Sequence, residues 1–379
     1  MCRRLLTFVL IFALNPLHAQ DGENLISRLK NKFFGTETDS TKNGSFIAVP
    51  ALGYAQETGL EYGLASTYSF FVDKRDPQRR SSNISFSATL TAKMQKNIKL
   101  SGDIWTRDNQ YHIISEVRYR DWPFNFYGIG NSTLAADKDY LGQRLTRAKI
   151  DVERKITNKL YLGLNAQFDH FQFEDIEAGG IYEQSSMYGR NGGKYIALGG
   201  SALFDNRDHT TYSTRGTYFR ARYAHAPKFW GGENFSGGIL ELDARAFYSP
   251  LSTVTLAAQG IYRATFAEHT PFYMYRELGG DTSMRGYYLG RYRDNNYTAL
   301  QSELRYRPIP RLGAAIFGSV GSTFSEQHPY RTITSYGAGV RYFFSLEHSS
   351  SIRFDYAIGE KRPGEKRQTG FYLSLSEAF

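Results

Sequence analysis

The sequence predicts an all-β fold, a membrane-spanning antiparallel β-barrel of about sixteen strands. Three observations carry this prediction. Apolar and ionic side chains alternate along many short segments, as they do when successive residues of a strand point to opposite faces. After residue 20 no apolar run approaches the roughly 20 residues that a spanning helix needs. Glycines (36) and aromatic residues (15%) are frequent, which favours turns and strands.

The first 20 residues have the features of a cleaved signal peptide. Arg3 and Arg4 precede the apolar run 5–14, and Ala19 supplies a small residue at the expected cleavage point. A membrane-anchoring helix is the alternative, but the run has only about half the required length. The only cysteine, Cys2, lies within this segment. We therefore expect a mature chain without disulfides, in which a short periplasmic N-terminal segment, 21–44, precedes a barrel domain, 45–379.

Alternation is clear between residues 298 and 307. One face carries Leu300, Leu304 and Tyr306, and the other carries Gln301, Glu303, Arg305 and Arg307. An apolar outside and an ionic inside suit a wall between lipid and a wet lumen. A soluble sandwich also alternates, but it needs two apolar inner faces.

Sixteen strands follow from the alternation and the turn residues, and an even number is usual for such barrels. The predicted strands are 45–50, 59–70, 82–93, 98–106, 111–121, 142–156, 158–170, 193–204, 216–226, 236–249, 252–264, 295–308, 311–321, 332–343, 350–358 and 369–379. Pro50 cannot donate a backbone hydrogen bond, so we expect a short, poorly paired first strand.

Long connections should face outward and short ones inward. We assign 122–141, 171–192 and 265–294 to the outer side and 156–159 to the inner side. Strand parity conflicts with this assignment in the first half, which indicates a missed or split strand there.

The formal net charge of +9 leaves a basic chain after Arg3 and Arg4 are removed, at +7. A nucleic-acid partner would fit the charge but not an exported, alternating chain. Cations facing the lumen or lipid phosphates explain it better. We expect outer-membrane lipid and lipopolysaccharide around the barrel and no nucleic acid.

The chain closes on an alternating segment in which Phe371, Leu373, Leu375 and Phe379 share one face. A strand that runs to a terminal phenylalanine resembles the C-terminal signal of bacterial outer-membrane barrels. The resemblance implies location in the cell outer membrane and the barrel assembly machinery as a partner during biogenesis.

Three segments resemble the bacterial surface-antigen superfamily, which includes BamA, TamA and the two-partner secretion transporters. The first is a turn between the eighth and ninth strands, formed by Asp205, Arg207, Asp208 and Gly216. The second is Leu278-Gly-Gly-Asp-Thr-Ser-Met-Arg-Gly-Tyr287, and the third is Arg353-Phe-Asp-Tyr356 with the chain end.

The second segment follows the eleventh predicted strand, which is the position of the family's sixth outer loop. The resemblance implies that this loop folds into the lumen with Met284, Arg285, Gly286 and Tyr287 at its tip. In the family an acid on strand thirteen receives the arginine, whereas this chain has Phe317-Gly-Ser319 there. Phe317 and Ser319 should still point inward. A buried guanidinium needs an acceptor, so Glu303 on the neighbouring strand is the preferred partner; an unpartnered arginine on a surface loop is the alternative.

The sequence contains no recognisable catalytic, metal-binding or cofactor-binding motif, so we expect neither an enzyme nor a cofactor. Eight histidines are scattered without ligand spacing. Asp205, Asp208 and His209 cluster, but a turn explains them as caps of backbone amides.

The resemblance implies a barrel that inserts or exports proteins through a seam or gated lumen, with a client or periplasmic partner protein. Unlike most members, it would have no periplasmic receptor domains. A passive pore or structural surface antigen is the alternative, and an outer-membrane enzyme ranks lowest.

Overall fold

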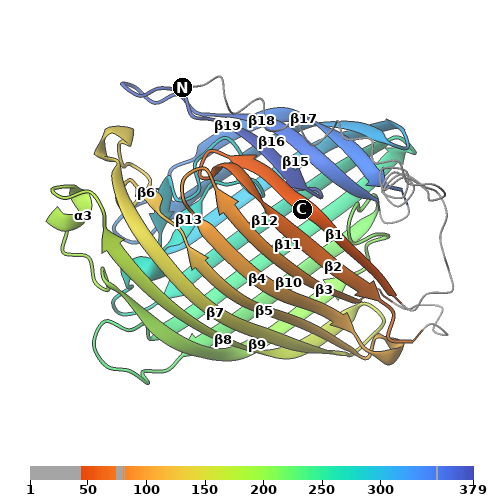
Figure 1. Cartoon of the computed structure of the whole chain (residues 1–379), viewed down its shortest axis with the longest axis horizontal. Helices are drawn as coiled ribbons and strands as arrows, with labels where there is room; N and C mark the ends of the chain where they lie inside the picture. The colour runs from red at the N-terminus through yellow and green to blue at the C-terminus, as the bar shows by residue number, and fades with distance from the viewer. Residues whose placement is uncertain (1–43, 74–79, 81, 347–348) are drawn as a thin grey trace, which may run out of the picture. The chain divides into compact units, whose positions relative to one another are not determined.

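A computed structural model of the chain describes residues 44–73, 80, 82–346 and 349–379. The predicted signal peptide and residues 21–43 lie outside the described residues. Residues from 44 onward form a closed antiparallel barrel in which sixteen strands follow one another in chain order (Figure 1). The wall strands are β1 (Gly44–Ala55), β2 (Gly59–Phe70), β3 (Ser82–Thr91), β4 (Lys96–Trp105), β5 (Tyr111–Asp121), β7 (Asp139–Lys155), β8 (Leu160–Asp175), β9 (Gly192–Asp205), β10 (Gly216–Ala226), β11 (Gly237–Leu251), β12 (Val254–Phe266), β15 (Asn296–Ile309), β16 (Leu312–Phe324), β17 (Ile333–Ser345), β18 (Ser350–Gly359) and β19 (Thr369–Leu375).

Seven shorter elements interrupt the wall or lie in its connections. They are β6 (Phe124–Phe126), β13 (Arg276–Leu278), β14 (Tyr292–Asp294), the helix α3 (Ile181–Gln184) and the 3₁₀ turns η2 (Arg107–Asn109), η3 (Ala135–Asp137) and η4 (Phe272–Met274). No helix in the described part of the chain is long and apolar enough to cross a membrane.

Every predicted strand corresponds to one wall strand, so the predicted count of sixteen is confirmed. The predicted conflict between strand parity and the sides of the connections was wrong, because 122–141, 171–192 and 156–159 all lie on the side that the strand count requires. One strand of the first half is split, because β5 stops before Pro123, which has no N–H to donate, and resumes as β6. Both pieces pair with β7, so parity is unchanged.

The two ends of the barrel differ in their connections. The end that carries β6, α3 and the long segment 267–295 is here named the loop end, and it lies on the left of Figure 1. The opposite end, named the turn end, has short connections such as 156–159 and 310–311. The three connections assigned to the outer side therefore lie at one end and 156–159 at the other, as expected, but 71–81 is a long connection at the turn end and 92–95 a short one at the loop end.

The first strand is longer than Pro50 led us to expect. β1 runs from Gly44 to Ala55 and pairs with β2 over twelve residues, Pro50 included. Its other edge pairs with β19 only at Tyr54. A missing N–H is tolerated in a strand with a largely free edge, which explains how proline fits here.

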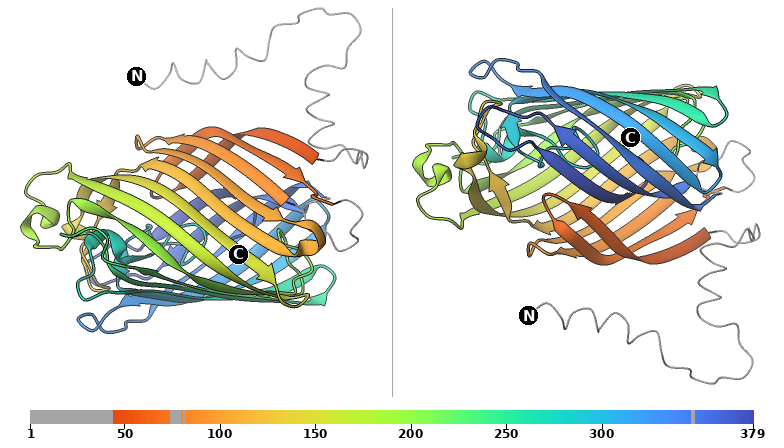
Figure 2. Two further views of the ribbon diagram at one scale, coloured as in Figure 1. Left: turned by 90° about the horizontal axis from the view of Figure 1, so that it is seen from below. Right: turned by 90° about the horizontal axis from the view of Figure 1, so that it is seen from above.

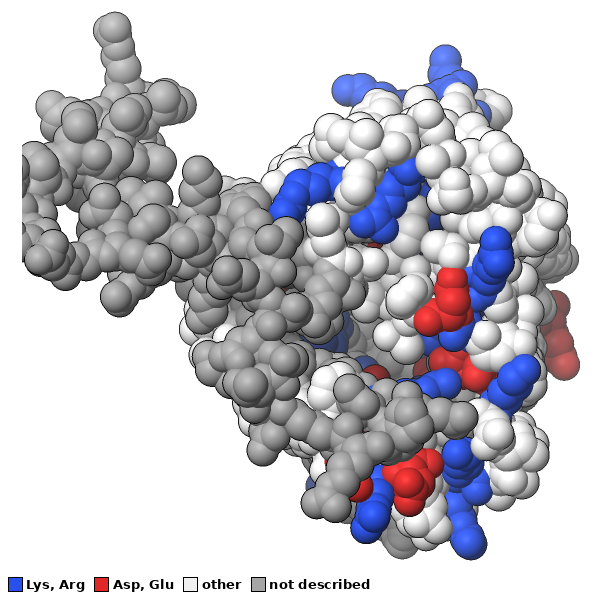
Figure 3. Space-filling view, turned by 90° about the vertical axis from the view of Figure 1, so that its right-hand side faces the viewer, with Lys and Arg blue, Asp and Glu red and all other residues white. Residues whose placement is uncertain are grey.

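Side chains divide between the two faces of the wall as the alternation predicts. On β15, Leu300 is 60% exposed on the outside, whereas Glu303 is 2% exposed and points into the lumen. Seen from the turn end, acidic and basic side chains gather around and inside the hollow of the barrel (Figure 3). The wall is thus apolar outside and ionic inside, as a membrane barrel requires.

The last strand ends sooner than predicted. β19 stops at Leu375, and the segment 376–379, here named the C-terminal tail, turns into the lumen. Ser376 adopts φ +68° while its N–H donates to Ser351 at 2.8 Å, next to the start of β18. Beyond that point β18 offers no partner, and Phe379 instead packs against Phe247 in the lumen. The prediction of a strand to residue 379, with Phe379 on the same face as Phe371, was therefore wrong.

Candidate functional site

The connection between β12 and β15, residues 267–295 and here named the lumen loop, folds back into the barrel. Its strands β13 and β14 pair with each other, and its buried Leu278, Met284 and Tyr287 pack against the wall strands β12, β15 and β17. Gly286 has φ +104°, and a Cβ there would lie 3.0 Å from the backbone of Gly359. Only glycine permits this close turn at the tip.

Arg285 at the tip is fully buried, with acceptors on two wall strands. Its Nη2 donates to Glu303 on β15, and its Nη1 lies 2.5 Å from Asp355 Oδ2 on β18. Its guanidinium carbon stands 3.5 Å over the ring of Phe317 on β16. Charge-assisted bonds and a cation–π contact together hold a cation that burial alone would strongly disfavour.

Asp355 supplies the acid that the Phe317-Gly-Ser319 stretch lacks. Ser319 is buried in the wall, and its Oγ has no hydrogen-bond partner among the described residues. Sequence analysis included Asp355 in the Arg353-Phe-Asp-Tyr356 segment but did not assign it to Arg285. Alternation along β18 indicates that the side chain of Asp355 points into the lumen. Its contact with Arg285 could not be predicted, because only closure of the barrel brings β18 next to the loop tip.

Four buried arginines surround this contact and define the arginine cluster: Arg285, Arg305, Arg341 and Arg353. Four acids contact them: Glu303, Asp355, Asp281 and Glu377. Counting side chains alone, the cluster is balanced, with four arginines and four acids. The wall supplies two of the acids, the lumen loop supplies Asp281, and the C-terminal tail supplies Glu377. Because an unpaired buried charge is expensive, loop and tail are both parts of the same electrostatic unit.

The tail makes two polar contacts with this unit. Glu377 Oε2 lies 3.1 Å from Arg341 Nε, and the main-chain oxygen of Phe379 accepts from Arg305 Nη2 at 3.1 Å. Arg305 in turn lies 2.7 Å from Glu303, the acceptor of Arg285. A continuous chain of ion pairs thus joins the loop tip to the tail.

The seam of the barrel is the junction of β1 and β19. One residue pair, Tyr54 with Leu373, joins these strands, and their ribbons diverge beyond it (Figure 2, right). On the outer face the rings of Tyr54 and Phe371 lie 5.6 Å apart. By comparison, β19 shares seven pairs with β18.

The lumen loop is bonded to both strands of the seam. Tyr372 of β19 points inward, accepts from the N–H of Gly286 at 2.9 Å and donates to the carbonyl of Tyr287 at 3.3 Å. At the other side, Glu57 in the turn after β1 accepts from the N–H of Leu289. The loop therefore ties the two edges of the seam together from inside.

Glu57 is a buried acid in the turn between β1 and β2, outside the spanning strands. Burial raises its pKa to about 7, despite hydrogen bonds to backbone amides that favour the charged form. The buried Gln95 donates to the carbonyls of Glu57 and Pro123, which fixes this turn. Sequence analysis missed Glu57, because a single acid in a turn carries no pattern.

The predicted family turn lies at the turn end, between β9 and β10. Asp205 forms a two-pronged ion pair with Arg207, at 2.9 and 3.0 Å. Asp208 accepts from the N–H groups of His209 and Thr214, both at 2.9 Å. These acids cap the turn as the sequence suggested, and Gly216 has φ +102° where β10 begins. No group of three or more potential metal ligands occurs within the described ranges.

A closed sixteen-strand barrel with an apolar outside, a loop locked in its lumen and a one-pair seam defines a class of outer-membrane barrel. The chain belongs to the Omp85 superfamily, whose domain description matches residues 51–379. This is the superfamily of protein translocation and assembly barrels that the loop, turn and chain-end segments resemble.

Solved structures agree in fold. BamA from Haemophilus ducreyi lacking POTRA domains 1–3 is 14% identical with a TM-score of 0.59, and the match covers 95% of this chain and 80% of that chain. CdiB from Acinetobacter baumannii (14%, 0.54) and CdiB from Escherichia coli (12%, 0.58) each match 88% of this chain. The match spans 60% and 62% of those two CdiB chains. A comparison with curated protein sequences finds no match.

Proposed function

We propose that this barrel inserts or exports polypeptides at the seam between β1 and β19, in the outer membrane with its loop end outward. The carrying observation is the single residue pair at this junction, against seven between β18 and β19 and twelve between β1 and β2. A client or periplasmic partner protein would be the substrate.

The unpaired edge of β1 at the seam would be the site at which a client strand is added. Continuing the register of Tyr54 and Leu373 by three residues would bring Ser376 opposite Ala51. Because the C-terminal tail turns into the lumen, the edge of β1 from Ala51 towards Gly44 stays without this partner. Lipid cannot satisfy backbone N–H and C=O groups, so an added client strand is favoured there.

The lumen loop acts as the restraint on opening. Through Tyr372 and Glu57 it holds both edges, and through Arg285 it is anchored to β15 and β18. Movement of the loop would release the seam and vacate the lumen in one step. A passive pore is the less favoured function, because the loop and the arginine cluster occupy the lumen.

Cysteines that lock the seam test the proposal. Tyr54→Cys with Leu373→Cys joins residues that lie directly opposite each other, a spacing suited to a disulfide. The chain's only native cysteine is Cys2. In proteoliposomes, oxidation should abolish insertion of an unfolded barrel client, and reduction should restore it.

The matched control locks the other side of the same strand. Phe354→Cys with Leu373→Cys joins β18 to β19, which already share seven pairs, and oxidation there should leave insertion intact. Equal activity of the oxidised and reduced seam variant would reject the proposal. Large, steady conductance of the oxidised barrel in planar bilayers would favour a passive pore instead.

A further inference from the structure

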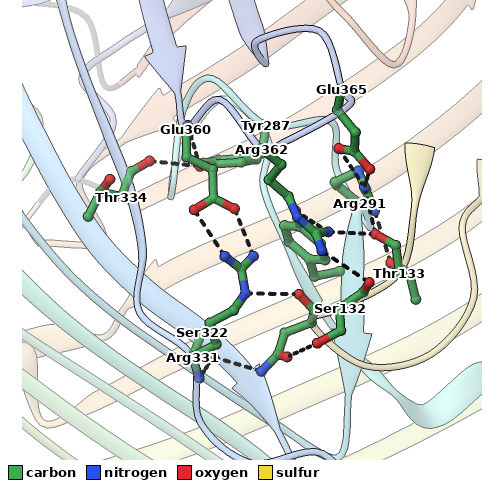
Figure 4. A network of polar contacts seen from close by, with 12 residues as sticks. Ser132, Thr133, Tyr287, Arg291, Ser322, Arg331, Thr334, Glu360, Arg362 and Glu365 are labelled. Carbon is green, nitrogen blue, oxygen red and sulfur yellow. Dashed lines mark hydrogen bonds and ion pairs between the residues drawn. The ribbon is translucent and has the colours of Figure 1, made fainter. Parts of the chain in front are cut away.

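In the connection between β18 and β19 at the loop end, some charged side chains point inward and others point to the surface. Its sequence is Glu360-Lys-Arg-Pro-Gly-Glu-Lys-Arg-Gln368. Glu360, Arg362 and Glu365 are partly or mostly buried in the network of Figure 4. Three cations remain exposed: Lys361, Lys366 and Arg367.

The inward side chains pin this connection to its neighbours. Glu360 forms a two-pronged pair with Arg331 at 2.7 and 3.1 Å. Arg362 donates to the carbonyl of Thr133 at 2.7 Å (Figure 4). Glu365 accepts from the N–H of Ala135 at 2.8 Å. Glu360 and Glu365 are therefore both bonded to groups within the network. Among the described residues, their negative charges are not paired with the three exposed cations.

A groove of about 500 Å³ lies beside these cations. Lys366 and Arg367 line it on one side together with Glu365, whose carboxylate is already bonded to the N–H of Ala135 and to Arg291. Residues 134–136 line it on another side. Gln56, from the turn after β1, and Thr369, the first residue of β19, also line it. The groove therefore spans the loop end of the seam and contains residues from both of its edges.

One of the cations that line the groove reaches the outer face of the barrel. Arg367 donates to the hydroxyl of Tyr336 at 3.3 Å, and Tyr336 is a 53% exposed outward residue of β17. Phe371 lies two residues along β19 from Thr369, about 7 Å away at the usual strand rise. Phe371 (42% exposed) and Tyr54 (40% exposed) form the apolar outer surface of the seam there. The cationic groove thus adjoins, through Thr369, the strand that carries the aromatic outer surface of the seam.

We propose that this groove binds a phosphate group of an acylated glycolipid of the outer leaflet. Lys366 and Arg367 would neutralise the phosphate, Gln56 and Thr369 would add hydrogen bonds, and an acyl chain would lie along Tyr54 and Phe371. A phosphorylated amphiphile matches both halves of the surface, the cationic rim and the apolar wall. The bound lipid would brace the seam where it holds its one residue pair. This inference rests on the proposed orientation, with the loop end outward.

Lipid binding to the purified, delipidated full-length barrel in detergent tests the site. Bisphosphorylated lipid A is titrated against the chain and against the double variant Lys366→Gln with Arg367→Gln, and binding is followed by native mass spectrometry. We expect the double variant to bind at least tenfold more weakly. Lipid A stripped of its phosphates should bind the unaltered chain as weakly as bisphosphorylated lipid A binds the double variant.

Two further variants make the result decisive. Lys366→Arg with Arg367→Lys keeps both charges and should bind nearly as the unaltered chain does. Lys159→Gln removes an exposed lysine at the turn end and should change nothing. Equal binding by the double variant, or by dephosphorylated lipid A, would overturn the proposal. Inorganic phosphate that binds as tightly as lipid A would show an anion site without lipid specificity and would overturn it too.

This assay needs no client polypeptide, so it is separate from the test of function. Loss of lipid binding with an intact effect of the seam lock would reject the lipid site alone. Binding that is retained while the seam lock has no effect would reject the proposed insertion activity and leave the lipid site standing.

Discussion

The wall formed by β7 and β8 and the seam formed by β19 and β1 are held by different forces. Fifteen residue pairs join β7 to β8, whereas one joins β19 to β1. The long pair is secured by its own backbone ladder. The seam is secured by side chains from elsewhere: Tyr372 and Glu57 bonded to the lumen loop, and the arginine cluster that anchors this loop. One barrel thus combines permanent junctions with a junction whose strength depends on a loop.

The largest effect should come from removing the loop anchor. Arg285→Ala leaves Glu303 and Asp355 without their buried cation, at a cost of about 3–5 kcal/mol. We expect rapid protease cleavage within 267–295. We also expect the barrel to have a lower melting temperature, because the seam loses the loop that restrains it. The control Arg144→Ala removes an exposed arginine on the outside of β7, paired with Glu174 at 3.8 Å, and should leave cleavage unchanged. Resistance of the Arg285 variant would refute the anchoring role.

Glu303→Gln should have the next largest effect, about 3 kcal/mol, because Arg285 and Arg305 both lose an ionised partner. Asp355→Asn should act in the same direction. Limited proteolysis of the lumen loop measures both. An unchanged digestion pattern for Glu303→Gln would mean that Asp355 alone holds the loop.

Glu57 should make the seam weaker as pH rises. Its folded-state pKa is about 7 against an ordinary 4.5, so the folded chain binds the proton more tightly than the unfolded chain. Stability is then greatest below about pH 4.5 and falls as pH rises to about 7, by at most about 3 kcal/mol. Hydrogen exchange of the lumen loop across this interval checks the slope. Glu57→Gln should flatten it; a variant with the same slope would assign the effect to another group.

The smallest effect should come from Tyr372→Phe, which deletes the hydroxyl contacts to Gly286 and Tyr287 at a cost of about 1–2 kcal/mol. Exchange should accelerate at β19 and β1. Tyr195→Phe, which deletes contacts to Gln167 and Asp169 on the far wall, is the matched comparison. If both variants loosen the seam equally, Tyr372 has no special role there.

Periodicity predicted the strands well because it is a local property. Each strand reports its two faces in its own residues, as Leu300 and Glu303 do, and sixteen such segments suffice to close a barrel. Pairing across the lumen is not local. Asp355 and Glu303 are far apart in sequence and meet at Arg285 only after closure. Pro50 misled the analysis because its effect depends on whether the strand's other edge is paired, which no local pattern reveals.

Alternation also could not predict where β19 ends. Glu377 interrupts the apolar face and Phe379 resumes it, so the pattern does not mark the end of the strand. In the structure the ladder ends where the N–H of Ser376 donates to Ser351, one residue from the start of β18. The tail is stabilised in the lumen instead, by packing against Phe247 and by polar contacts with Arg305 and Arg341.

The inward turn at Ser376 has a practical consequence for work on this protein. A purification tag or reporter fused after Phe379 would begin inside the bore, where it must displace Phe379 from Phe247 and break the contact with Arg305. Such fusions should disturb the lumen even when the barrel folds. Residues 176–179, exposed at the loop end, offer a site for an inserted epitope that leaves the bore untouched.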